Sequence, residues 1–66
     1  NMKADFILIS PRDGSSGQVE TETFQVANIT HVPRVGERIC HGGRDYDVYE
    51  VTWDYEEGTV CIGARF

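Results

Sequence analysis

The chain has 66 residues, 39% of them hydrophobic, and eleven acids against six bases give a formal charge of −5. This length allows a single domain over residues 1–66, and the apolar content excludes a disordered chain. The acidic balance disfavours contact with phosphate backbones, so we expect no nucleic-acid partner. No apolar run approaches the roughly 20 residues of a membrane span, and none suits a signal peptide, so we expect a cytoplasmic protein.

Turn residues recur at short intervals along the chain, among many β-branched and aromatic residues. This pattern predicts several short strands and no long helix. Residues 10–17 contain Pro11 and an Asp-Gly pair and are expected to form a loop. The strands are expected at residues 5–10, 18–26, 37–41, 44–54 and 59–66. The fold class that follows is all-β, a small five-stranded barrel or β-roll.

The glycine pair at 42–43 is the strongest local signal in the chain. Two glycines between strands favour a two-residue hairpin turn, because such turns need positive φ angles. The resulting register would place His41 opposite Arg44 and Ile39 opposite Tyr46.

In the strand over residues 44–54, the apolar side chains move from one face to the other halfway along. Tyr46 and Val48 share one face by simple alternation, whereas Val51 and Trp53 share the other. One bulge near residues 49–50 would return all four side chains to the core and bend the strand. The residues expected in the core are Ile39, Tyr46, Val48, Val51, Trp53, Val60 and Ile62.

A family resemblance rests on three features: residues 32–39, the Gly-Gly hairpin, and the pattern Tyr46-x-Val48-x-x-Val51-x-Trp53. Together they resemble the core of small SH3-like barrels, including short bacterial and phage families of uncharacterised role. The resemblance covers roughly the C-terminal half of the chain. It implies an SH3-like barrel and no particular activity, because function on such folds depends on the individual site.

Residues 45–57 contain six acids and neither Lys nor Arg. Such a segment is either a solvated polar face or a contact surface for a basic partner. We expect a non-enzymatic protein-binding module that uses this face. The resemblance to short bacterial and phage families implies that it could be an accessory or inhibitor protein of a mobile element. The candidate binding residues are Asp45, Asp47, Tyr49, Glu50, Asp54, Tyr55, Glu56 and Glu57.

Three arginines just before the acidic segment support an alternative function. Arg34, Arg38 and Arg44 make up half of the basic residues of the chain. If they share one surface, they would suit an SH3-like module that binds nucleic acid.

A second alternative is a small metal protein built on His31, Cys40, His41 and Cys61. Zinc takes such ligands, but the neighbours Cys40 and His41 point to opposite faces of a strand. We therefore expect no metal, no other cofactor and no Cys-His catalytic pair, so the protein is not expected to be an enzyme. Reduced thiols suit the cytoplasm, while a single disulfide stays open for an exported protein.

Self-association is expected because an open barrel leaves a strand edge unpaired. Residues 6–9 are apolar on both faces, and Phe66 is unfavourable in water. These features predict a homodimer through the side of the first or the last strand. The acidic residues 45–57 would then stay free for another protein.

Overall fold

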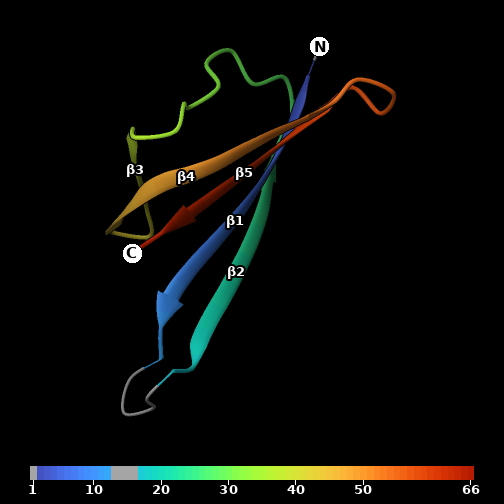
Figure 1. Ribbon diagram of the computed structural model, residues 1–66. Coiled ribbons are helices and arrows are strands. Elements are labelled where there is room, and N and C mark those ends of the chain that lie inside the picture. Colours follow the sequence, from blue (N-terminus) through green and yellow to red (C-terminus); the bar gives the residue numbers. More distant parts are fainter. Residues whose placement is uncertain (1, 13–16) are drawn as a thin grey trace.

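A computed structural model describes residues 2–12 and 17–66, which form five strands and no helix (Figure 1). The expected all-β class is therefore confirmed. The strand over residues 44–54 has its predicted bounds. The first strand begins two residues earlier and ends one residue later than predicted, and each of the other three is one residue shorter at one end. Of the loop expected at 10–17, residues 13–16 lie outside the described part. Within that part, no helix is long and apolar enough to cross a membrane. The strands are β1 (Lys3–Pro11), β2 (Val19–Val26), β3 (Arg38–His41), β4 (Arg44–Asp54) and β5 (Thr59–Arg65).

The five strands form one sheet in the order β2-β1-β5-β4-β3. Strands β1 and β5 run parallel, with Lys3 opposite Thr59 and Ile9 opposite Arg65, and all other neighbours are antiparallel. Because β1 and β5 each have neighbours on both sides, neither offers an open edge. The expected dimer contact through an edge of one of these strands is therefore wrong, whereas self-association itself stays a prediction.

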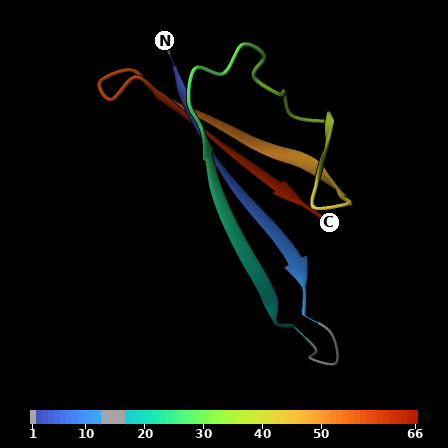
Figure 2. The same cartoon turned by 180° about the vertical axis from the view of Figure 1, so that it is seen from behind.

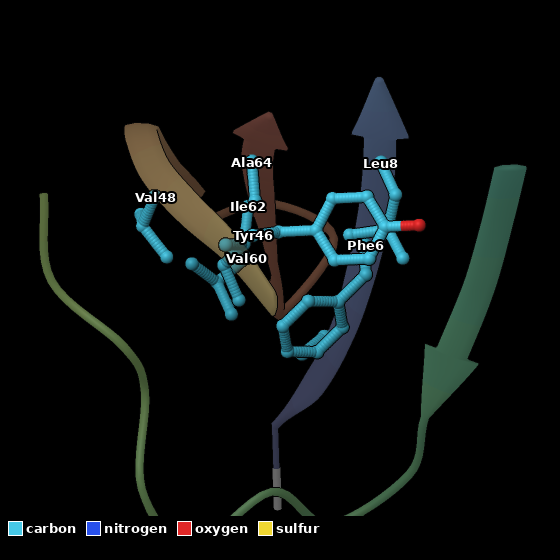
Figure 3. Packing of buried hydrophobic residues seen from close by; sticks show 8 residues of the cluster. Phe6, Leu8, Tyr46, Val48, Val60, Ile62 and Ala64 are labelled. Carbon is cyan, nitrogen blue, oxygen red and sulfur yellow. The ribbon is translucent and has the colours of Figure 1, made fainter. Parts of the chain in front are cut away.

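The sheet curls into a half-barrel whose concave face holds the core (Figures 1 and 2). Figure 3 shows the core side chains of β1, β4 and β5 pointing into this common space. The four expected core residues Tyr46, Val48, Val60 and Ile62 are buried, while Ile39 and Val51 are only partly buried against the cluster. The buried apolar residues are Ala4, Phe6, Leu8, Tyr46, Val48, Val60, Ile62 and Ala64.

The hairpin between β3 and β4 has the predicted turn. Gly42 and Gly43 have φ angles of 61° and 78°. His41 lies opposite Arg44, as expected from a two-residue connection, and Ile39 lies opposite Tyr46. Residues with a Cβ atom rarely adopt these angles, so the glycine pair sets the register of β3 on β4.

The predicted bulge in β4 is also present. The register of β4 on β5 shifts between Val48 and Glu50, which leaves Tyr49 as the extra residue. The shift returns Val51 to the face that carries Val48. Bulges increase local twist and bend a strand, and this bend helps the short sheet to curl.

The expected burial of Trp53 is wrong, since its side chain is 45% exposed. The bulge does turn Trp53 toward the same face as Val51, as predicted. However, no strand among residues 2–12 and 17–66 lies opposite this part of β4. The irregular connection over residues 27–37 runs there instead (Figure 2), and it leaves a cleft in front of the indole.

The two outer strands of the sheet meet through side chains. The His41 ring of β3 stacks on the Phe24 ring of β2, with centroids 4.1 Å apart and planes within 7°. Phe24 stacks in turn on Phe6, at 4.7 Å. His41 Nε2 lies 2.9 Å from Glu22 Oε2, within hydrogen-bond distance. Among the described residues β2 pairs with β1 and β3 with β4, so these side chains close the half-barrel without a backbone ladder.

Candidate functional site

The outer face of β4 carries a row of carboxylates. Alternation along the strand, with the bulge at Tyr49, points Asp45, Asp47, Glu50 and Asp54 away from the core. All four residues are exposed. The row therefore exists as the sequence predicted.

Part of this row is neutralised within the chain. Arg38 Nε donates a hydrogen bond to Asp47 Oδ1 at 3.0 Å across the β3–β4 pair. This hydrogen bond, together with the charge of Asp47, raises the pKa of Arg38. Arg65 of β5 lies opposite Asp47 on its other side. The β3 end of the row is consequently less negative than the sequence alone indicates.

Tyr49 has a structural role on the same outer face. A Cβ atom added at Gly63 would come within 3.0 Å of Tyr49 Cζ, so the ring rests on this glycine. The Arg65 guanidinium covers the ring at 4.1 Å from its centroid, a cation–π contact. Tyr49 is therefore held by its neighbours and is less available to a partner than the sequence suggested.

The remaining candidate residues form an exposed tip on the β4–β5 hairpin, here called the acidic tip: Asp54, Tyr55, Glu56 and Glu57. Asp54 Oδ1 accepts a hydrogen bond from Glu57 N at 3.0 Å, and Gly58 N donates to Asp54 O at 2.9 Å. These bonds hold the loop in one turn. Tyr55 is 85% exposed. Within the described part of the chain, no Lys, Arg or His forms an ion pair with an acid of the tip.

A cleft of about 450 Å³ lies beside the hairpin, at the end of β4. Its residues are Thr30, His31, Val32, Pro33, Arg34, Val35, Val51 and Trp53. We call it the Trp53 cleft. Pro33 is buried, whereas Trp53 and Val35 are 45% and 62% exposed. The cleft thus offers an aromatic and aliphatic surface to solvent.

Sequence reasoning missed this cleft, although two signals bear on it. The connection before β3 is rich in aliphatic residues, with Val32, Pro33 and Val35 close together, but as part of residues 32–39 it indicates only a resemblance in fold. The alternation that predicts a buried Trp53 identifies the face of a residue and not whether anything covers that face.

The wall of the cleft is tied to β4 by hydrogen bonds. Gly36 N donates to Val48 O, and Val48 N donates to Glu37 O, both at 2.9 Å. Glu37 also closes the turn before β3, since its Oε1 accepts from Arg34 N at 2.8 Å. This backbone hydrogen bond lowers the pKa of Glu37, and the nearby charges of His31 and Arg34 act in the same direction.

The rim of the cleft carries one unpaired cation. The Arg34 guanidinium forms no ion pair with any described residue. His31 also lines the cleft, and its Nε2 lies 3.6 Å from the Glu37 carboxylate oxygen Oε1. An apolar floor beside an unpaired guanidinium suits a ligand that combines an apolar group with an acid.

The structure does not bring the three arginines of the first alternative together. Arg38 bonds to Asp47 on the outer face, Arg44 lies over the Phe66 ring at 4.4 Å, and Arg34 belongs to the cleft. The described residues therefore offer no single surface built from these three side chains.

The proposed metal ligands are also dispersed. In the described part of the chain, no three His, Cys, Asp or Glu residues lie close enough to hold a metal ion. Cys40 and Cys61 are both free thiols. Partial burial, followed by the charges of Asp5 and Glu50, raises the pKa of the Cys61 thiol, which makes it a poorer nucleophile.

No protein-family model matches the chain, and comparisons with curated proteins and with solved structures find no match. The function must therefore be argued from the chemistry of the tip and the cleft.

Proposed function

We propose that this chain is a non-enzymatic protein-binding module whose contact surface is the acidic tip and the adjacent Trp53 cleft. The observation that carries the proposal is Tyr55, which is 85% exposed between acids that have no ion-pair partner among the described residues. Tyr and Trp are enriched among the residues that dominate protein interfaces. Uncompensated carboxylates favour a partner that presents Lys or Arg together with apolar groups.

Several features favour a role in binding a partner over a role in catalysis. The tip is a protruding turn, which gives little shelter from water to a reacting group. Cys40 and His41, the nearest approach to a nucleophile with a base, alternate on β3, where His41 stacks inward on Phe24. A cytoplasmic location is part of the proposal, and the two free thiols support it.

The charge of the tip also suggests what such a module could do. A nucleic-acid-binding protein presents the basic surface that this chemistry favours. An accessory or inhibitor protein of a mobile element would act by covering that surface. In this more specific form of the proposal, the charge of the tip supports the basic partner, and the resemblance to short bacterial and phage families supports the link to a mobile element.

The test is site-specific photo-crosslinking in cells. An aryl-ketone amino acid replaces Tyr55 in one variant and Val19 in the control, since Val19 is also exposed but lies on β2. We expect discrete adducts from position 55 that are absent from position 19, with their composition identified by mass spectrometry. Equal adducts from both positions, or none from position 55, would overturn the proposal.

A further inference from the structure

The acidic tip and the Trp53 cleft are complementary and lie next to each other. The tip joins an exposed Tyr55 to two free carboxylates, whereas the cleft joins an apolar floor to Arg34 and His31. Trp53 lines the cleft and directly precedes the tip along β4, so both features belong to the same end of this strand. Tyr55 is 85% exposed, so the chain does not fill its own cleft with its own tip.

We infer that the cleft of each chain receives the acidic tip of a second copy, and that two chains exchange tips in a two-fold dimer. This inference rests on the proposed function and names the partner of the same site. Because tip and cleft lie at the same end, one two-fold axis forms both contacts at once. Such closed two-fold dimers are the commonest protein oligomers.

The chemistry of the contact is specific. Tyr55 of one copy packs on Trp53 and Val35 of the other, which covers apolar surface that both chains otherwise expose. Glu56 and Glu57 then lie near the Arg34 guanidinium on the rim of the cleft. Two copies, each with a formal charge of −5, repel each other as whole molecules. The tip–cleft contact brings each chain's acids to a cation of the other and so counters this repulsion locally.

The small size of the chain favours the same arrangement. A domain of this length buries only about 60% of the surface of its unfolded chain. Among the described residues, an irregular connection and an open cleft face the second half of β4, and Trp53 stays 45% exposed. A second copy supplies that missing cover at Trp53.

The first experiment uses Trp53, the single tryptophan of the chain, as its own reporter. Sedimentation and fluorescence are measured over a concentration series. We expect the mass to rise from 7.4 kDa toward twice that value, and the Trp53 emission to shift to the blue over the same concentrations. The variant Tyr55→Ser should lose both changes, while Val19→Ser, which removes a similarly exposed apolar group elsewhere, should keep them.

The second experiment tests the charge pairing. Arg34→Glu and the double change Glu56→Lys with Glu57→Lys should each raise the dimer dissociation constant about tenfold or more. Mixing the two proteins restores opposite charges at both tip–cleft contacts of a heterodimer, so we expect recovery of wild-type affinity. All three side chains are exposed, so the variants retain the fold.

Two results would overturn the dimer: wild-type protein that stays at 7.4 kDa with unshifted emission at millimolar concentration, or no recovery on mixing. Crosslinks from position 55 to another protein alone would reject the dimer and leave the proposed function standing. Monomeric protein without such crosslinks would reject both.

Discussion

The two halves of β4 carry similar apolar residues on the same face and have different surroundings. Before the bulge, Tyr46 and Val48 are 6% and 3% exposed, whereas Trp53 beyond it is 45% exposed. The first half packs into the cluster built with β1 and β5, while the second half faces the irregular connection and its cleft. Alternation therefore identifies the face of a residue, and burial depends on what the rest of the chain places opposite.

The largest expected effect is the contrast between Ile62→Ala and Trp53→Ala. Ile62 is fully buried, and removing it should lower the free energy of unfolding by about 2–5 kcal/mol. Trp53 leaves no closed cavity, so its loss should lower that free energy by about 1 kcal/mol. Urea unfolding followed by far-ultraviolet circular dichroism, at low micromolar concentration, measures both. Equal losses would show that Trp53 is covered within the single chain.

A smaller effect is expected at the turn that starts the first half of β4. Gly43 has a φ angle of 78°. Gly43→Ala should therefore lower the free energy of unfolding by about 1–2 kcal/mol, because a Cβ atom opposes this conformation. Gly43→Asn is the matched control, since asparagine tolerates positive φ and should lose less. The same loss in both variants would mean that side-chain size, and not the backbone angle, determines stability here.

The side-chain closure of the half-barrel predicts a further difference, now between the two histidines. His41→Ala removes the stack on Phe24 and the contact with Glu22, and should lower the free energy of unfolding by about 1 kcal/mol. His31→Ala on the open cleft rim should change it little. The variant His41→Phe keeps a ring but not the Glu22 contact, and its stability should lie between wild type and His41→Ala. Indistinguishable His41 and His31 variants would contradict the closure.

The smallest effect is a pH dependence at the cleft wall. The hydrogen bond from Arg34 N lowers the pKa of Glu37 below its ordinary value of 4.5. The stabilisation is thus complete above pH 4.5 and is lost as the pH falls through the lower pKa of the folded state. Glu37→Gln should remove this part of the acid sensitivity, measured as the urea midpoint across a pH series. A variant as acid-sensitive as wild type would show that Glu37 does not hold the turn.

Local patterns predicted much of the sheet. The glycine pair defined the β3–β4 register, because only a few turn types connect strands with two residues. The alternation of Tyr46, Val48, Val51 and Trp53 indicated the bulge, because one extra residue is the simplest way to place all four on one face. Both inferences depend on residues close together in the chain.

The contacts between segments far apart in the sequence could not be predicted from such local patterns. Nothing near residues 3–11 indicates that β1 pairs parallel with β5, so the two true sheet edges were not foreseen. The exposure of Trp53 depends on the path of a connection some 20 residues earlier, which has no strand pattern. The acids of 45–57 were correctly expected on the surface. The hydrogen bond from Arg38 partly neutralises Asp47 and not the acids of the tip. This difference could not be predicted without knowing that β3 pairs with β4.

The parallel pairing of β1 with β5 also bears on how the chain folds. Leu8 and Ala64, which lie opposite each other at the centre of the sheet, belong to the first and last strands. The β1–β2 and β3–β4 hairpins can form early, but the core closes only when β5 enters between β1 and β4. Topologies dominated by such distant pairings fold slowly, since the loop-closure entropy is lost before the contacts form. During synthesis, β1 can pair with β2 and Phe24 can stack on Phe6, but the side of β1 that pairs with β5 stays open until β5 has been made.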